Sequence, residues 1–93
     1  MLEKIKGRMG IHESVKIYDL EIAGLISDAT HDLGFSGVPK GVINKQTNSV
    51  LTAITMYVKA NFGNDRSDTN RYMTLYRQKV FRLTMEEGGK DVE

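Results

Sequence analysis

The chain has 93 residues, with 13 Lys and Arg, 12 Asp and Glu, and a formal net charge of +1. We expect 1–93 to form a single domain, and a chain of this length leaves little room for a deep, enclosed active site. Cys is absent, which excludes disulfides, thiolate nucleophiles and Cys-based zinc sites. No apolar run approaches the roughly 20 residues of a membrane span, and the N-terminus lacks the apolar stretch of a signal peptide. We therefore expect a soluble, cytosolic protein that does not enter a membrane.

The first two predicted helices differ in length. A short helix is expected over 2–9, although Gly7 lowers its stability by about 1 kcal/mol relative to Ala. Its apolar residues share one face: Leu2, Ile5 and Met9. A long helix is expected over 19–33, with Asp19 suited to its N-cap and Gly34 to its end. Its apolar residues recur at helical spacing: Ile22, Leu25, Ile26, Ala29 and Leu33.

Residues 35–46 are predicted to form a loop. Three turn-forming residues, Gly37, Pro39 and Gly41, alternate there with apolar ones. A loop of this length is near the upper limit for a compact domain. Its apolar residues predict that it is anchored to the rest of the chain: Val38, Val42 and Ile43.

Two more long helices follow this loop. The first has an N-cap at Thr47 or Asn48 and ends at Gly63. Its apolar residues are Val50, Leu51, Ile54, Tyr57, Val58 and Phe62. The second is expected over 68–85, capped by Ser67 or Asp68, and the short polar link before it predicts an antiparallel hairpin. The apolar stripe of this last helix comprises Tyr72, Leu75, Tyr76, Val80 and Leu83.

None of these helices is long enough to be stable alone. Isolated helices of about 15–18 residues are marginal in water, so their apolar stripes must pack on one another. The predicted fold class is all-α: a small bundle of three long helices plus a short N-terminal helix, with a long loop between the first two long helices. The acidic tail over 86–93 contains two adjacent glycines and is expected to be disordered.

Candidate catalytic and metal-binding groups are few. Asp28, His31 and Asp32 lie in one predicted helix and could hold a divalent cation in a metal-assisted hydrolase. We favour the alternative, a solvated polar surface opposite the apolar stripe, because this is the usual layout of an amphipathic helix. The sequence contains no nucleophile-elbow or phosphate-cradling motif. We therefore predict no catalytic, cofactor or metal site and no enzyme activity.

The last predicted helix is basic. Between 59 and 82 the chain has six Lys and Arg but only two Asp, a local balance of +4. Arg side chains match phosphate oxygens and Tyr rings can stack on bases, so one hypothesis is a small DNA-binding module. Its candidate phosphate contacts are Arg66, Arg71, Arg77 and Arg82. The alternative is a core role for the tyrosines and a solvated surface for the arginines, which the pI of about 8.0 favours because dedicated DNA binders are more basic.

Three apolar residues of the same helix lie off its main stripe: Met73, Phe81 and Met85. Apolar residues on two faces of a helix need two partners. The second partner is either the short N-terminal helix or another chain, and the sequence favours neither. Because Met and Arg are enriched at protein interfaces, these three residues are candidate subunit contacts.

Three stretches carry a family resemblance. The pattern D-x-x-I-x-x-L-I-x-x-A-x-x-D-L begins at Asp19, and a G-x-x-G-V turn follows at Gly34. The string A-I-x-x-Y-V-K-A-x-F-G begins at Ala53, and R-Y-x-x-x-Y begins at Arg71. Over about 17–83 the sequence therefore resembles the small head–tail connector (adaptor) proteins of tailed bacteriophages and prophages, which are also known as DNA-packaging proteins.

The resemblance implies a structural subunit that assembles as a homo-oligomeric ring below the portal, with the portal protein and tail or stopper proteins as partners. DNA would pass through this ring without sequence-specific binding. The expected location is the head–tail junction of the virion, or the host cytoplasm during assembly. A closed ring needs two different contact surfaces on each subunit. Besides the three residues of the last helix, the candidates for contact with a neighbour or the portal are Val38, Val42 and Ile43.

Overall fold

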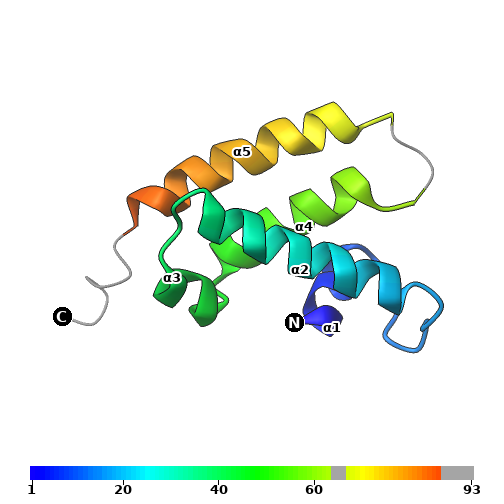
Figure 1. Ribbon diagram of the computed structural model, residues 1–93. Coiled ribbons are helices and arrows are strands. Elements are labelled where there is room, and N and C mark those ends of the chain that lie inside the picture. The colour runs from blue at the N-terminus through cyan, green and yellow to red at the C-terminus, as the bar shows by residue number, and fades with distance from the viewer. Residues whose placement is uncertain (64–66, 87–93) are drawn as a thin grey trace.

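A computed structural model describes residues 1–63 and 67–86 (Figure 1). These residues form helices and no strand: α1 (Leu2–Arg8), α2 (Asp19–Phe35), α3 (Lys40–Lys45), α4 (Asn48–Asn61) and α5 (Thr69–Met85). The all-α prediction is thus confirmed for the described part of the chain. All of the predicted disordered tail over 86–93 except Glu86, and the candidate Arg66, lie outside the described residues.

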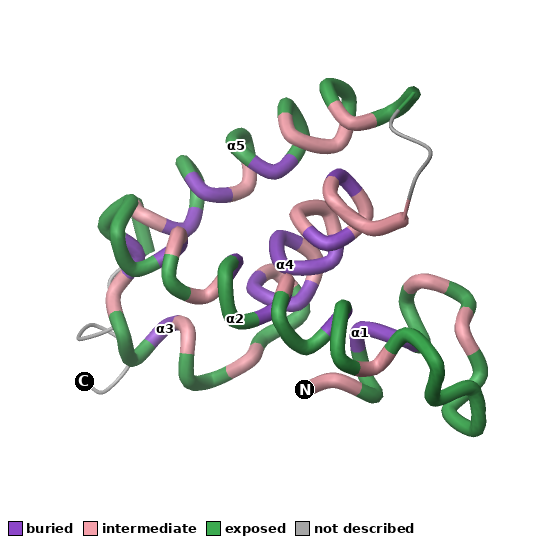
Figure 2. Tube along the Cα trace, turned by 45° about the vertical axis from the view of Figure 1, so that its right-hand side comes forward, coloured by how far each residue is buried: buried purple, intermediate pink, exposed green. Residues whose placement is uncertain are grey.

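Helix α4 lies at the centre of the fold. In Figure 2 it is buried along much of its length, with α5 on one side and α2 on another. Its packing against α5 is the most extensive between any two elements, and its packing against α2 comes next. Thr47 caps the helix as predicted, because its Oγ1 accepts a hydrogen bond from the Val50 amide at 3.3 Å. The helix ends at Asn61, shortly before Gly63 adopts a φ of 77°.

Helix α5 runs beside α4 in the opposite direction (Figure 1). The face toward α4 buries Tyr76, Val80 and Leu83. Leu75, expected on the same stripe, is instead 37% exposed. A single neighbouring helix covers only a narrow arc of α5, and Leu75 lies at the edge of that arc.

Helix α2 buries one stripe and leaves the opposite face in solvent. The predicted residues Ile22, Ile26, Ala29 and Leu33 are buried, and Leu25 is half-buried against the same core. The predicted end at Gly34 is wrong, because the helix continues to Phe35. The chain turns two residues after the helix end, at Gly37, which has a φ of 104°.

The predicted loop over 35–46 is wrong in part, because it contains the short helix α3. Pro39 stands directly before α3 with a φ of −60°, which suits a helix start. Val38 and Val42 are 3% and 1% exposed, so they anchor this segment in the core. The helix ends at Lys45, and the next residue, Gln46, has a φ of 50° in the left-handed region.

A buried lysine organises the N-terminal segment. Lys6 on α1 is 1% exposed, and its ammonium donates hydrogen bonds to the main-chain oxygens of Glu13 at 3.2 Å and Val15 at 2.5 Å. The same nitrogen lies 2.8 Å from Oδ1 of Asp19, at the start of α2. One charged group therefore joins α1, the segment over 9–18 and α2. Helix α1 also packs on α4.

Candidate functional site

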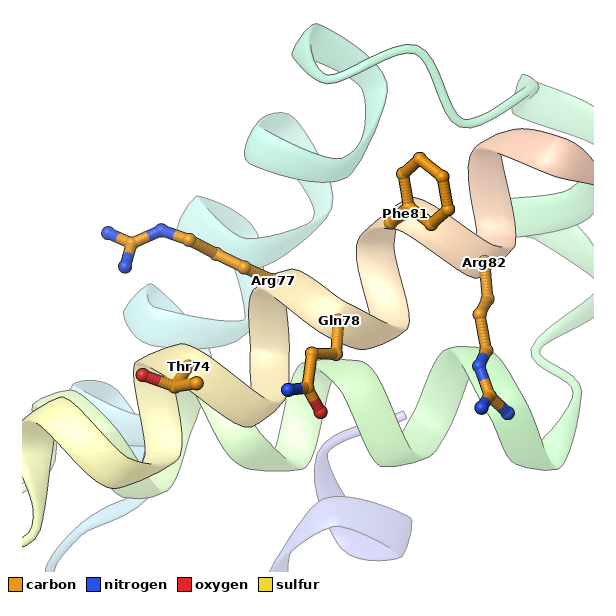
Figure 3. A pocket seen from close by; sticks show the side chains of 5 residues that line it. All are labelled: Thr74, Arg77, Gln78, Phe81 and Arg82. Atoms are coloured by element: carbon orange, nitrogen blue, oxygen red, sulfur yellow. The ribbon is translucent and has the colours of Figure 1, made fainter.

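The candidate functional site is the face of α5 turned away from α4. Phe81 and Met85 on this face are each 68% exposed. A shallow surface pocket is lined by Thr74, Arg77, Gln78, Phe81 and Arg82 (Figure 3). In Figure 3 Arg77 and Arg82 extend in different directions, with Phe81 standing on the helix between them. The site therefore combines an unpartnered aromatic ring with flanking cations, a combination typical of protein interfaces.

All charged side chains of α5 are basic. Helix α5 carries two more basic residues, Arg71 and Lys79, and no Asp or Glu. The three predicted phosphate contacts that the structure describes, Arg71, Arg77 and Arg82, are all exposed. Arg71 lies 5.9 Å from the centroid of the Tyr72 ring, and Lys59 of α4 lies 5.7 Å from it. Tyr72 is thus engaged by cations of its own chain at one end of α5.

The other predicted subunit contacts are less accessible. Val38 and Val42 belong to the chain's own core, as described above, and Val38 contributes only to the floor of a groove between α2 and α3. Met73 is half-buried against the same core, and its sulfur lies 3.9 Å from Nδ2 of Asn61. Ile43 is half-buried and lines a surface groove between α2 and α3 with Phe35. A partner can therefore reach Ile43, Phe81 and Met85 more readily than the first three residues.

Sequence reasoning missed a second exposed apolar surface. Leu20 and Phe35, near the two ends of α2, are 91% and 96% exposed, and Ile17 before the helix is 81% exposed. The apolar periodicity identified only the buried stripe of α2. The available signal was the presence of large apolar residues off that stripe, the same signal that identified Phe81 and Met85.

Helices α2 and α5 are joined by a polar contact. The hydroxyl of Tyr76 donates a hydrogen bond to Oδ2 of Asp32 at 2.5 Å. The Tyr76 ring packs edge-on against the Tyr57 ring, with 5.2 Å between the two ring centroids. Burial raises the pKa of the Tyr76 phenol above its ordinary value, and the hydrogen bond to Asp32 and the charge of Asp32 raise it further. Burial likewise raises the pKa of Tyr57, with smaller contributions from the Asp28 and Asp32 charges. Asp32 thus has a structural role beside Tyr76.

The residues considered for a cation site do not form one in the described part of the chain. No group of three or more His, Asp or Glu side chains there could hold a metal ion. Asp28 and His31 are exposed, while Asp32 accepts the Tyr76 hydrogen bond. The described helices also include none that is long and apolar enough to span a bilayer.

Comparison with models of known protein families gives a match. The family model for phage connector proteins matches residues 1–90. The chain belongs to this family. The predicted head–tail connector resemblance is therefore confirmed, and the chain is a member of a structural protein family that works with other head and tail proteins of the phage. No curated protein and no solved structure matches the chain.

Proposed function

We propose that the protein is a head–tail connector subunit that assembles into a ring below the phage portal. The ring completes the DNA exit channel and offers a docking surface to the tail or to a stopper protein. The observation that carries this proposal is the connector family match over residues 1–90. The large apolar residues that α2 and α5 expose support it, because contact with a partner would remove their side chains from water. These residues are Leu20, Phe35, Phe81 and Met85.

A ring also needs the right relation between its contact surfaces. A closed ring forms through head-to-tail contacts, in which one surface of a subunit meets a different surface of the next. Helices α2 and α5 both pack on α4, and their exposed faces point in different directions (Figures 1 and 2). Each subunit therefore has two distinct apolar surfaces, as such a contact requires.

The charge of the chain is compatible with DNA passage. The net charge is only +1, and a channel that gripped phosphates strongly would hinder DNA movement. In this proposal the ring surrounds DNA without reading its sequence. The chain then acts at the head–tail junction of the virion, or in the host cytoplasm during assembly.

Native mass spectrometry and sedimentation over a concentration series test the ring. We expect an oligomer of one size, either in the purified chain at high concentration or after addition of the portal protein from the same phage. A chain that remains monomeric at its highest soluble concentration, and also in the presence of portal, would contradict the proposal.

A second candidate function is binding of duplex DNA by α5. The observation that favours it is the run of exposed arginines on a helix without acidic residues: Arg71, Arg77 and Arg82. A salt titration of duplex binding tests it, because affinity that depends on phosphate contacts falls steeply as salt rises. The Arg77→Ala variant should then weaken binding uniformly across DNA sequences. Failure of the wild-type chain to bind duplex DNA at low salt would remove this candidate.

A further inference from the structure

The exposed face of α2 carries features that the packing of the chain itself does not explain. Leu20 and Phe35 project into solvent near the two ends of the helix. Between them, Gly24 lies within a regular helix, where glycine destabilises the helix relative to Ala. A Cβ at Gly24, or at Gly34 one residue before Phe35, would meet no atom of the chain within 4 Å. Neither glycine is therefore required by contacts within the subunit.

The charges of α2 and α5 are opposite. Helix α2 contains four acidic residues and no Lys or Arg, whereas α5 contains four basic residues and no Asp or Glu. Three of the acidic residues have partners within the chain: Asp19 beside Lys6, Glu21 bonded to the Gly63 amide, and Asp32 bonded to Tyr76. Asp28 is exposed. Asp28 is therefore the acidic residue of α2 that remains for a basic partner outside the subunit.

The shapes of the two faces also match. The exposed α2 face has small side chains at Ala23, Gly24 and Ser27, with His31 one turn further toward Phe35, whereas the exposed α5 face carries the projecting ring of Phe81 (Figure 3). The stretch of small side chains lets a second helix approach closely. Arg77 and Arg82, which flank Phe81, then come near the exposed Asp28.

We infer that the exposed face of α2 in one subunit binds the exposed face of α5 in a second copy of the same chain. This inference rests on the proposed ring and assigns the two surfaces that form its repeated contact. The contact is head-to-tail, because an α2 face meets an α5 face and leaves the other α5 and α2 faces free for further subunits. Apolar contact of Phe81 and Met85 with Leu20, one turn from Gly24, supplies the affinity, and the opposite charges select the pairing.

Disulfide trapping tests the inference directly, because the natural chain has no Cys. Ser27→Cys lies at the middle of α2 and Gln78→Cys lies near the middle of α5, and both positions are exposed. The two single variants are mixed, oxidised mildly and analysed by intact mass. We expect the mixed Ser27→Cys/Gln78→Cys dimer to exceed each homodimer by roughly tenfold.

A matched variant controls for random collision. Lys4→Cys is exposed on α1, which belongs to neither proposed contact surface, and should give only background disulfide with either partner. A mixed dimer at this background level would overturn the inference, as would a predominance of 27–27 or 78–78 homodimers. If the wild-type chain nevertheless forms a closed ring by native mass spectrometry, the proposed function stands and only the assigned contact fails. If the wild-type chain does not form a ring with or without portal, both fail.

A glycine pair provides a second test that does not depend on oxidation. Gly24→Leu adds a side chain into open space on the α2 face, and Gly7→Leu does the same on α1. Neither variant should lower the melting temperature, because Leu favours the helix more than Gly does. We expect the apparent association constant to fall roughly tenfold or more in Gly24→Leu and to be unchanged in Gly7→Leu. Equal assembly of the two variants would overturn the inference.

Discussion

The two faces of α5 show how one helix serves two purposes. Val80 and Phe81 are adjacent in the sequence, yet Val80 is 8% exposed and Phe81 is 68% exposed. Val80 belongs to the core, whereas Phe81 is not among the residues that form it. The buried face packs on α4, whereas the exposed face leaves apolar surface that none of the described residues covers.

Helix α2 repeats this division with the opposite charge. Its buried stripe packs on α4, while Leu20 and Phe35 remain in solvent beside acidic residues. The comparison teaches that hydrophobicity alone does not separate core residues from exposed apolar residues in so small a protein. What separates them is whether the residue faces α4. The following substitutions test the division, beginning with the largest expected effect.

Ile54→Asp should unfold the protein. Ile54 is fully buried at the centre of the core, and an unpaired carboxylate there cannot keep its hydration. We expect a loss of more than about 4 kcal/mol, enough to abolish the cooperative thermal transition. Gln78→Glu, which adds the same charge to the exposed face of α5, should shift stability by less than about 0.5 kcal/mol. Circular dichroism melting measures both, and similar melting curves would refute the assignment of the α4 face.

Lys6→Met should destabilise the N-terminal segment. The substitution keeps the apolar stem but removes the ammonium, which leaves two carbonyl oxygens and the Asp19 carboxylate without their partner. We expect a loss of about 2–4 kcal/mol in chemical denaturation. Lys4→Met is the matched control, because Lys4 is exposed on the same helix. Equal stability of the two variants would show that the buried ammonium contributes nothing.

Tyr76→Phe should lower the free energy of unfolding by about 1–2 kcal/mol at neutral pH, because it removes the hydrogen bond to Asp32 and leaves the ring in place. The pKa of Tyr76 is raised in the folded state, so the unfolded chain releases this proton first as pH rises. Stability from this group is therefore complete below the unfolded pKa of about 10 and declines above it.

Melting curves recorded over a pH series check this effect. The wild-type chain should lose stability more steeply above pH 10 than Tyr76→Phe, which cannot lose that proton. Parallel curves for the two proteins would contradict the assignment.

Phe81→Ala should have the smallest effect on stability, within about 0.5 kcal/mol, because the ring is largely in solvent. Its neighbour Val80→Ala should lose about 2 kcal/mol through lost burial. The effects on assembly should have the reverse order. Phe81→Ala should assemble less well than the wild-type chain, and Val80→Ala should assemble normally under conditions where this variant is folded. Thermal melts combined with native mass spectrometry measure both quantities. Normal assembly of Phe81→Ala would place the contact elsewhere.

Much of the fold could be predicted from the sequence. The stripe of α4, its Thr47 cap and the buried stripe of α2 follow from local spacing and capping chemistry. The errors arose where tertiary contacts decide. The segment over 35–46 forms α3 because Val42 reaches the core, which no local turn preference indicates. Lys6 is buried because the segment after α1 folds back and brings the main-chain oxygens of Glu13 and Val15 to its ammonium, and a lysine in the sequence gives no such signal.

Only part of the candidate site could be predicted from the sequence, from apolar residues that lie off the main stripe of a helix. Phe81 and Met85 were identified because they lie off the main stripe, and the same reasoning did not extend to Leu20 and Phe35. Val38 and Val42 were also apolar residues outside any predicted helix stripe, yet they are core residues in the structure. An apolar residue in a predicted loop can face inward or outward, and only the placement of the neighbouring helices distinguishes the two.

The sequence by itself determined that the chain is helical, where its long helices lie, and which family it belongs to. These properties depend on apolar spacing, end-capping residues and motif strings, all of which are local. The tertiary structure decided which apolar residues remain exposed and that the acidic α2 and basic α5 present separate faces around α4. Exposure depends on what every other segment covers, and that information appears only when the whole chain has packed.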